Sequence, residues 1–477
     1  MTLADPAAVL ECYDTKRAIR HRSDRAHYRY CEIPWPTSQT VILSIEKLIY
    51  GGDGLARVPA GAGGRSLAVF APFVFPGEKV EAEVLQEKPG FAGGFARANV
   101  TKLVEASPER VVAGCPHFQQ CGGCHYQHIP YNRQLEFKAQ ILRETLARVG
   151  KIELNDGIRV HPSPPWNYRN RARLQVRTLP DFALGYYRFG SREFLPVQEC
   201  PIGSPLINRV VARLTEPGSL QCPPEVEELE LFADAADEHL LAWAFCSRDA
   251  REKDLVAWAE GLRREVPSLI GLHFFSSQRR SEDEPLSDWK LLAQSGEKAV
   301  RYRCAQGTYQ VGAGAFFQVN RHLIDELVAV VTGNVGGNTA LDLYAGVGLF
   351  SVPLAEKYRH IFAVEASQIS FASLKQNVPA TVKTIGTRTE EFLSSRAARK
   401  RPDLILLDPP RAGAGKAVIR SLIELGAQRI RYVSCDPATL ARDLAPLLAA
   451  GYRIEETHLF DLFPQTFHIE SVMLLAR

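Results

Sequence analysis

Short apolar runs alternate with amphipathic stretches through the last third of the chain. The runs have the length of buried parallel strands, and the stretches between them are long enough for a helix. Strands that alternate with helices predict a doubly wound α/β fold, so we expect a Rossmann-like domain over residues 306–477. The four runs cover residues 340–343, 361–364, 404–407 and 430–433.

A different pattern occupies residues 40–105, where short β-like runs are separated by glycine-rich turns. Several short strands with such turns predict a small, OB-like β-barrel. Barrels of this kind often bind nucleic acid, but the fold alone fits a packing module equally well. The runs cover residues 41–45, 67–70, 79–85 and 96–104, and the turns cover residues 51–54 and 60–64.

The remaining segments are assigned by position and periodicity. Residues 1–39 have no clear periodicity and are expected to form an N-terminal extension. Apolar residues recur at helical spacing over residues 131–149, and β-like runs at 174–177 and 229–232 indicate a mixed region. We therefore expect a central α+β domain over residues 106–305, between the barrel and the Rossmann-like domain.

Composition and charge exclude some classes of protein but do not identify a function. The 477 residues are 45% hydrophobic and 23% charged, as in soluble globular proteins, and suffice for about two to four domains. We find no apolar run of about 18 residues and no apolar secretory core at the N-terminus, so we expect a cytoplasmic protein. In that setting the ten cysteines indicate metal binding or catalysis rather than disulfides. The net charge of +3 neither requires nor excludes a nucleic-acid partner.

The run at 340–343 leads into a glycine-rich turn and the start of a helix. Gly346 and Gly348 let the backbone turn tightly and approach a ligand. Glu365 ends the next run about 20 residues later, where an acidic side chain can accept hydrogen bonds from both ribose hydroxyls of a nucleoside. A dinucleotide site would look similar, although it usually has Gly or Ala at the position of Ser351. The plainer alternative is that the glycines serve only a strand-to-helix turn.

A second segment separates these alternatives. Asp408, Pro409, Pro410 and Arg411 follow the run at 404–407, and ligands of doubly wound sheets bind outside the carboxyl ends of the strands. The prolines stiffen the backbone and leave Asp408 facing the crevice. A redox enzyme has no evident need for this segment, whereas a methyltransferase can use it beside the methyl donor and the target base.

Cys435 follows the run at 430–433 and therefore lies at the same crevice. Asp436 and Pro437 begin a helix, and a helix N-terminus favours thiolate over thiol. The alternative is a buried structural cysteine, which is a common fate for this residue type. The position at a strand end beside Asp408 favours a nucleophile.

A thiolate suits one particular methylation. Carbon 5 of uracil is a poor nucleophile, but addition of a thiolate at carbon 6 produces an enolate that reacts with a sulfonium methyl group. A base then removes the carbon 5 proton, and elimination releases the cysteine. Glu470, next to an expected last strand at 471–475, is the candidate base, and His468 is a weaker one. A solvated strand-end carboxylate is the alternative reading of Glu470.

Three cysteines follow the barrel in a C-x5-C-x2-C pattern, Cys115, Cys121 and Cys124, and Cys200 lies far downstream. Three close cysteines plus a distant Cys-Pro suit a cubane [4Fe–4S] cluster. Structural zinc more often uses two C-x2-C pairs and is the alternative. The radical type of S-adenosylmethionine enzyme fits poorly, because a separate glycine loop already supplies the donor site.

The segment 166–177 is both basic and aromatic. A stripe of arginines on an extended strand suits phosphate contacts, with Tyr168 or Trp166 able to stack on a base. The alternative is a solvated or salt-bridged strand face. The arginines that an extended strand would place on one face are Arg169, Arg171, Arg173 and Arg177.

In combination these motifs resemble the class I RNA uracil-5-methyltransferases, and specifically the iron–sulfur branch that acts on 23S ribosomal RNA. The resemblance covers nearly everything from Thr40 onward. It rests on residues 314–320, 342–351, 408–411, 434–437 and 463–470.

The resemblance implies roles for individual residues. Cys435 would be the nucleophile and Glu470 the base, and residues 40–105 would form a TRAM barrel, an RNA-binding module. Near the adenine the family often has an acidic or amide residue, whereas this chain has Thr387, Arg388 and Thr389. The residues that would contact S-adenosylmethionine are Gln318, Tyr344, Leu349, Glu365 and Asp408, and those that would hold the [4Fe–4S] cluster are Cys115, Cys121, Cys124 and Cys200.

The resemblance also implies RNA as the partner, with 23S rRNA favoured because transfer RNA enzymes of the family usually lack the cluster cysteines. No membrane or obligate protein partner is expected, and the protein is expected to be a monomer. Three alternatives stay open: the same chemistry on uridine 54 of transfer RNA, an RNA-binding protein with an inactive enzyme domain, and a small-molecule methyltransferase.

Overall fold

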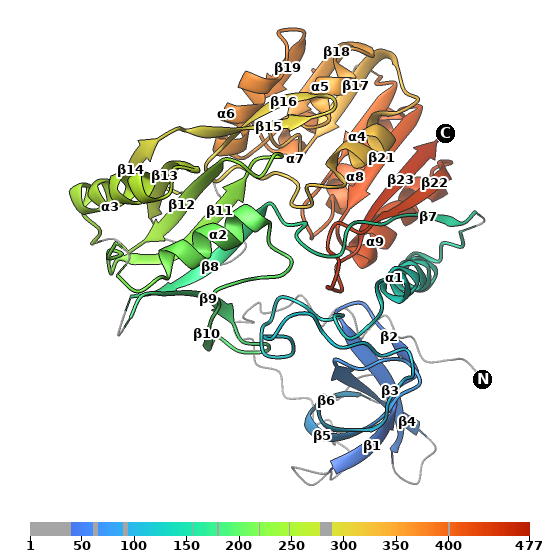
Figure 1. Cartoon of the computed structure of the whole chain (residues 1–477). Helices are drawn as coiled ribbons and strands as arrows, with labels where there is room; N and C mark the ends of the chain where they lie inside the picture. Colours follow the sequence, from blue (N-terminus) through green and yellow to red (C-terminus); the bar gives the residue numbers. More distant parts are fainter. Residues whose placement is uncertain are drawn as a thin grey trace, which may run out of the picture. The chain divides into compact units, whose positions relative to one another are not determined.

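The chain folds into two compact units in a computed structural model (Figure 1). The first comprises Met1–Ala113, His125–Glu153 and Gln465–Phe467, and the second comprises Gly114–Cys124, Leu154–Pro464 and His468–Arg477. The expected extension at 1–39 and most of the expected turn at 60–64 lie outside the described residues. The structure describes residues 40–60, 65–88, 94–154, 156–178, 181–218, 220–247, 249–276, 289–398 and 401–477.

The first unit contains a barrel-like sheet in the order β1-β5-β6-β4-β3-β2, in which only β4 and β6 run parallel. Its inner face packs around buried small and branched side chains such as Leu43, Val69 and Val80. All four predicted runs form strands, and the sheet also contains β2 and β3, which the sequence did not predict. The strands are β1 Thr40–Ser44, β2 Lys47–Leu48, β3 Asp53–Ala60, β4 Arg65–Pro72, β5 Lys79–Lys88 and β6 Phe95–Glu105.

The predicted helix at 131–149 is present as α1 Tyr131–Thr145, followed by a π-helical turn at Leu146–Gly150. It belongs to the barrel unit, although the sequence placed it in a central domain. Gln134 fixes the segment Gln465–Phe467 to this unit, because its Nε2 donates to Oε1 of Gln465 and its Oε1 accepts from the Gln465 backbone, both at 3.0 Å.

In the second unit, a seven-stranded sheet has the order β10-β9-β8-β11-β12-β13-β14, followed by the hairpin β15–β16. Helices α2 Pro205–Leu214 and α3 Glu252–Glu265 bury their apolar stripes in the same core against this sheet. The expected runs at 174–177 and 229–232 lie within β8 and β11. The strands are β8 Arg171–Arg177, β9 Ala183–Tyr187, β10 Phe194–Pro196, β11 Val226–Ala233, β12 Leu240–Cys246, β13 Leu269–Ser276, β14 Leu291–Gly296, β15 Ala299–Cys304 and β16 Gly307–Gly312.

The second unit also holds an eight-stranded sheet in the order β19-β18-β17-β20-β21-β23-β22-β7 (Figure 1). Strands β17 to β21 are parallel to their neighbours, and β23 runs antiparallel between β21 and β22. The strands are β7 Ile158–His161, β17 Gly337–Leu343, β18 Tyr358–Val364, β19 Val382–Ile385, β20 Leu404–Leu407, β21 Arg429–Ser434, β22 Arg453–Phe460 and β23 Glu470–Ala476.

This order confirms the predicted doubly wound α/β domain. From β17 the chain moves outward to β18 and β19, and then returns to β20 on the other side of β17. Such a reversal opens a crevice at the carboxyl ends of the central strands, where ligands bind. The helices are α4 Ile324–Thr332, α5 Ser351–Leu354, α6 Gln368–Asn377, α7 Thr389–Ser394, α8 Gly415–Leu425 and α9 Pro437–Ala449. None of the helices in the described part of the chain combines the length and hydropathy that a membrane crossing requires.

Candidate functional site

The loop after β17 has the backbone that its glycines predict. Gly346 and Gly348 have φ values of 57° and 92°, and Tyr344 shares this left-handed region at 62°. A Cβ atom on Gly348 would lie 2.9 Å from the Leu374 side chain, so only glycine lets the loop pack against α6. The turn therefore needs its glycines both for conformation and for close packing.

Below this loop, Asp342 is fully buried at the end of β17 and accepts a 2.5 Å hydrogen bond from the Ser351 hydroxyl. Burial raises the pKa of Asp342 to about 7. Ser351, which departs from a dinucleotide-binding pattern, thus has a structural function: it donates to one oxygen of a buried carboxyl group beneath the loop.

Glu365 lies where the sequence predicts it, at the end of β18 beside the glycine loop. Its two carboxylate oxygens accept from the backbone of Gly346 at 2.8 Å and of Ser367 at 2.6 Å. Burial raises its pKa. These bonds hold the carboxylate against the loop, and its contact with a ribose stays a prediction.

Tyr344 and Leu349 occupy the same loop but differ in environment. Burial raises the pKa of Tyr344 to about 12, and a hydrogen bond with the Thr389 side chain opposes this shift. The segment that departs from the family pattern near the adenine therefore lies beside Tyr344. The Leu349 side chain packs in the main core, and its carbonyl accepts from the Tyr309 hydroxyl at 3.0 Å.

Gln318 and Asp408 meet at the crevice from distant parts of the sequence. Gln318 Nε2 donates to Asp408 Oδ2 across 3.5 Å, and the Gln318 carbonyl accepts from Asn170 Nδ2 at 3.0 Å. The Asp408 backbone donates to the Leu343 carbonyl, which fixes the end of β20 against β17. Burial raises the pKa of Asp408 to about 7.

Cys435 and Glu470 are placed together by the register of two antiparallel strands. Ser434 of β21 pairs with Ser471 of β23. Cys435 follows Ser434 and Glu470 precedes Ser471, so the two predicted catalytic residues lie at the same end of this strand pair. Glu470 is only 5% exposed, which excludes the alternative of a solvated carboxylate.

Burial and neighbouring carboxyl groups raise the pKa of Cys435 and Glu470 at this end of the sheet. The pKa of the half-buried Cys435 thiol lies well above its ordinary value because of burial, the neighbouring Glu470 and then Asp408. Burial and Asp408 raise the pKa of Glu470 in the same way, while the positive charge of Arg411 opposes the shift. Sequence reasoning gave Arg411 no role, although an arginine directly after a strand-end Asp-Pro-Pro was a usable signal.

The predicted preference of a helix N-terminus for the Cys435 thiolate is opposed by burial and the neighbouring carboxyl groups, and it stays a prediction. Helix α9 does begin at Pro437 as predicted. However, Asp436 caps the helix, because its Oδ1 accepts from the backbone of Ala438 at 3.0 Å and of Thr439 at 2.8 Å. The first helical N–H groups thus serve the Asp436 cap, while burial and then the neighbouring carboxyl groups raise the pKa of Cys435.

Comparison with known proteins decides the family. Residues 292–477 match the family model of tRNA (Uracil-5-)-methyltransferase. A 23S rRNA (uracil(1939)-C(5))-methyltransferase of Halomonas elongata is 32% identical to this protein, over 91% of this chain and 89% of its own. The chain belongs to the RNA uracil-5-methyltransferase family.

Two further proteins agree with this assignment. An RNA methyltransferase of Halalkalibacterium halodurans is 30% identical over 93% of this chain and 98% of its own. The crystal structure of Pyrococcus abyssi tRNA (uracil-54, C5)-methyltransferase with S-adenosyl-L-homocysteine has the same fold, with a TM-score of 0.67 and 24% identity over 91% and 99% of the two chains. The protein is thus an S-adenosylmethionine-dependent RNA methyltransferase, as the sequence predicts.

The predicted cluster cysteines lie in the second unit. The pKa of Cys121 rises to about 11 because of burial and the neighbouring Cys200 and Cys115, and the Gly123 backbone donates to its Sγ at 3.4 Å. Asn208 holds the Cys200 backbone through two 3.0 Å hydrogen bonds. Three of the four thiols thus influence one another, and thiolates are the ligands that an iron–sulfur cluster takes. Nowhere in the described residues do three or more Cys, His, Asp or Glu side chains form a ready metal-binding group, so the cluster stays a prediction.

The basic strand has a different role from the one predicted. Alternation along β8 does place Arg171, Arg173 and Arg177 on one face. However, Arg171 donates to the Ala315 carbonyl at 2.7 Å and lies 4.6 Å over the Phe232 ring, and Arg173 donates to Glu228 at 2.6 Å. The salt-bridged alternative is therefore correct for the start of this strand.

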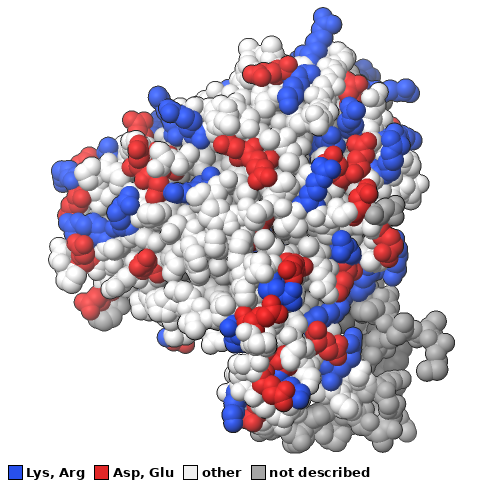
Figure 2. Space-filling model, turned by 45° about the vertical axis from the view of Figure 1, so that its right-hand side comes forward, with Lys and Arg blue, Asp and Glu red and all other residues white. Residues whose placement is uncertain are grey.

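Tyr168 is also unsuited to stacking on a base, because it is fully buried and donates to the Pro464 carbonyl at 3.0 Å. Figure 2 shows Lys and Arg side chains interspersed with Asp and Glu over the face in view. On this face, the charged side chains thus form no broad basic stripe of the kind that favours RNA.

Proposed function

We propose that this enzyme methylates carbon 5 of a uridine in RNA, with Cys435 as the nucleophile and Glu470 as the base. The observation that carries the proposal is the convergence of Cys435, Glu470 and Asp408 at the carboxyl end of the sheet that also bears the glycine loop. A cysteine and two carboxyl groups provide the nucleophile and the proton acceptors that this reaction needs.

The donor side of the site would use the five residues predicted from the sequence. S-adenosylmethionine, when bound, supplies an electrophilic methyl group. Glu365 is held to accept from ribose hydroxyls, and Gln318 and Asp408 present polar atoms beside the loop. Tyr344 and Leu349 flank them, with Leu349 contributing apolar surface rather than a polar contact.

Two carboxyl groups with raised pKa values, Asp408 and Glu470, would accept the protons in this reaction. Asp408, with a pKa of about 7, is partly ionised at neutral pH and can accept the Cys435 proton when the thiol adds to carbon 6 of uracil. Carbon 5 then carries the nucleophilic electron pair of the enolate. After methylation, Glu470 removes the carbon 5 proton in its ionised form, which burial and Asp408 disfavour, and the carbon–sulfur bond breaks to restore the double bond. Arg411 favours the ionised form of Glu470 at that step.

As substrate we propose 23S rRNA. Relatives that match nearly the whole chain are named as 23S rRNA uracil-5-methyltransferases. The cysteine set Cys115, Cys121, Cys124 and Cys200 supports the same choice and would hold a structural [4Fe–4S] cluster without redox turnover. Transfer RNA is the second candidate, because the family model and the archaeal crystal structure carry that name.

We also propose the domain roles that the resemblance implies. Residues 40–105 would act as a TRAM-type RNA-binding barrel, residues 106–305 as the cluster-bearing domain and residues 306–477 as the methyltransferase domain. Because ribosomal RNA is the proposed substrate, the cytoplasm is the expected location.

A mechanism-based substrate tests the chemistry. RNA that contains 5-fluorouridine lacks the removable carbon 5 proton, so the enzyme should remain covalently attached to it after methyl transfer. We expect a denaturation-resistant adduct with the wild-type enzyme and none with Cys435→Ser. Cys304→Ser, a matched change at a half-buried cysteine in β15, should retain the adduct. An adduct that persists in Cys435→Ser would refute the assignment of the nucleophile.

The target RNA needs a separate measurement. Loss of 5-methyluridine from 23S rRNA in a deletion strain, restored by the wild-type gene but not by Cys435→Ser, is the expected result. Loss from transfer RNA alone would replace the ribosomal substrate with the second candidate and leave the chemistry intact.

A further inference from the structure

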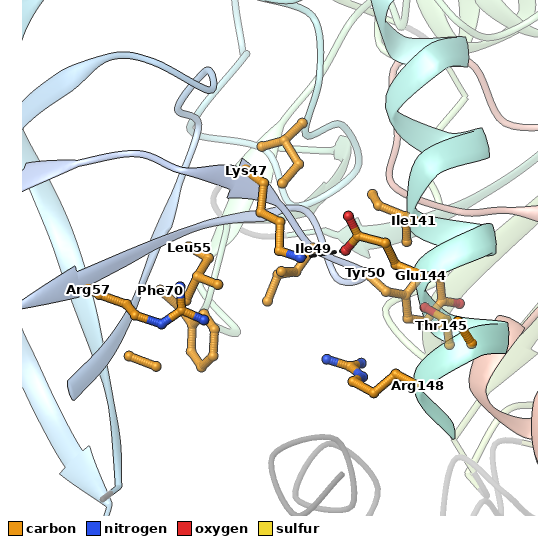
Figure 3. Close-up of a pocket in the computed structure, with 13 residues that line it drawn as sticks. Lys47, Ile49, Tyr50, Leu55, Arg57, Phe70, Ile141, Glu144, Thr145 and Arg148 are labelled. Atoms are coloured by element: carbon orange, nitrogen blue, oxygen red, sulfur yellow. Dashed lines mark hydrogen bonds and ion pairs between the residues drawn. The ribbon is translucent and has the colours of Figure 1, made fainter. Parts of the chain in front are cut away.

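The first unit contains a cavity of about 490 Å³ that the proposed reaction does not use. Strands β2, β3 and β4 line one side, and helix α1 with its π-helical turn lines the other (Figure 3). Cavities of roughly 300–1,000 Å³ accommodate small organic ligands, so this one has room for a nucleotide.

The strand side of the cavity is apolar and aromatic. Leu55 and Phe70 are buried at its base, and Ile141 closes it from the helix. The Tyr50 ring stands at a right angle to the Phe467 ring, with centroids 5.6 Å apart, which restricts its orientation. Fixed aromatic and aliphatic surfaces of this kind can pack against the flat face of any nucleobase, whatever the RNA sequence.

Three cations surround the same space. Lys47 and Arg57 come from the strands and Arg148 from the π-helical turn, and Figure 3 shows Arg57 and Arg148 reaching toward it from opposite sides. Glu144 is the one carboxylate among the lining residues, so positive charge predominates. This arrangement suits a ligand whose anionic group contacts the cations while its apolar part contacts Leu55 and Phe70.

The ion pairs of these cations do not prevent such binding. Lys47 lies 2.5 Å from Glu144, and Arg57 lies 2.5 Å from Glu46, but the side chains of both pairs are 38–52% exposed. Exposed pairs contribute little stability, so a phosphate can replace or share the carboxylate partner. Burial alone would raise the pKa of Glu144, but hydrogen bonds from Lys47 and Gln140 outweigh it and lower the pKa.

We propose that this cavity binds one unstacked nucleotide of single-stranded RNA, with the base on the Phe70 and Tyr50 side and the phosphate between Arg57 and Arg148. The inference rests on the proposed function only in taking RNA as the ligand. It gives the enzyme a second RNA contact within the first unit, formed jointly by the barrel strands and helix α1.

The test uses the full-length protein and a fluorescein-labelled oligouridine of twelve nucleotides, with affinity measured by fluorescence anisotropy over a range of salt concentrations. Arg57→Glu should weaken binding about tenfold and reduce the salt dependence, because a phosphate contact is lost. Ala147→Trp fills the cavity without changing charge and should weaken binding to a similar extent. Lys253→Glu, at an exposed position of α3 outside both the barrel and the cavity, is the control for charge and should change affinity less than about twofold.

Equal effects of Arg57→Glu and Lys253→Glu, or an unchanged affinity in Ala147→Trp, would overturn the proposal. A 4-thiouridine version of the same oligonucleotide should crosslink to peptides that contain Tyr50 or Phe70, and crosslinks confined to the second unit would also overturn it. These readouts are independent of methylation, so an inactive wild-type enzyme would refute the proposed function and leave this binding result interpretable.

Discussion

The side-chain amide of Gln318 donates from Nε2 to Oδ2 of Asp408 across 3.5 Å. This bond joins the loop after β16 to the carboxyl end of β20, although the two residues are 90 positions apart in the sequence. Gln318 is itself held by Asn170, whose Nδ2 donates to the Gln318 carbonyl. The donor side of the crevice is thus assembled from three separate segments of the second unit.

Gln318→Ala should therefore weaken binding of the donor product. Gln318 is only 6% exposed. The substitution removes a hydrogen-bond donor to the buried Asp408 carboxyl group and leaves a space where the Gln318 side chain packed. Loss of one such bond costs about 1–2 kcal/mol, so the Kd for S-adenosylhomocysteine should rise about tenfold in calorimetric titrations. Gln428→Ala, at the exposed amino end of β21, should leave the Kd unchanged; similar Kd values for both variants would remove Gln318 from the donor site.

Cys435 should react slowly with iodoacetamide at neutral pH and faster as the pH rises to about 10. The thiolate is the reactive form, and burial together with Glu470 and Asp408 raises the pKa of this thiol above its ordinary value. Glu470→Gln removes one of these negative neighbours and should accelerate alkylation roughly three- to tenfold at a fixed pH. Mass spectrometry of the Cys435 peptide measures the rate.

The matched control is Glu455→Gln on the exposed part of β22, which should not alter the alkylation rate. A rate at Cys435 that is already maximal near pH 7 would contradict the raised pKa. Equal rates in wild type and Glu470→Gln would contradict the electrostatic coupling between the two residues.

The residues at the strand ends could be predicted from the sequence because their positions depend only on which segments form strands and on the direction of those strands. The runs at 404–407 and 430–433 are parallel strands, so Asp408 and Cys435 had to reach the same edge of the sheet. The position of Glu470 beside Cys435 also follows once the last strand is known to pair with β21. These parts of the site need only strand identity and direction.

Other features could not be predicted because they depend on contacts between distant segments. Arg171 is held by the carbonyl of Ala315 and the ring of Phe232, and neither partner is near it in the sequence. The high pKa of Cys435 likewise arises from burial and from two carboxyl groups of other segments, whereas the local sequence shows only a helix N-terminus. Periodicity locates a side chain on a strand face but does not identify what covers that face.

The proposed iron–sulfur cluster can be tested by the metal content of the purified protein. Protein purified without oxygen should contain about four iron atoms per chain and show broad visible absorbance. Cys121→Ser and Cys200→Ser should lose both signals, because each removes one proposed ligand, while Cys246→Ser in the buried strand β12 should retain them. Zinc in place of iron in the wild-type protein would contradict the cluster and favour the zinc alternative.

A chain of hydrogen bonds between two histidines predicts how stability depends on pH. His161 Nδ1 lies 2.6 Å from Glu326, His161 Nε2 lies 2.9 Å from His458 Nδ1, and His458 Nε2 lies 2.9 Å from Glu456. Carboxylates only accept, so the outer nitrogens carry protons and the inner bond needs one proton more. Burial, the largest contribution, lowers the pKa of His458 and so favours the neutral form of this histidine.

Protonation of His458 would place a positive charge on a buried side chain, which burial disfavours. A histidine whose folded-state pKa is lowered contributes stability that is complete above its unfolded pKa of about 6.5 and is lost as the pH falls below that value. The free energy of unfolding of the second unit should therefore decrease from pH 7.5 toward pH 5, and His458→Gln should make this decrease shallower. Urea unfolding at a series of pH values measures both slopes, with His360→Gln at an exposed position of β18 as the matched control. Identical slopes for wild type and His458→Gln would show that this histidine does not couple folding to pH.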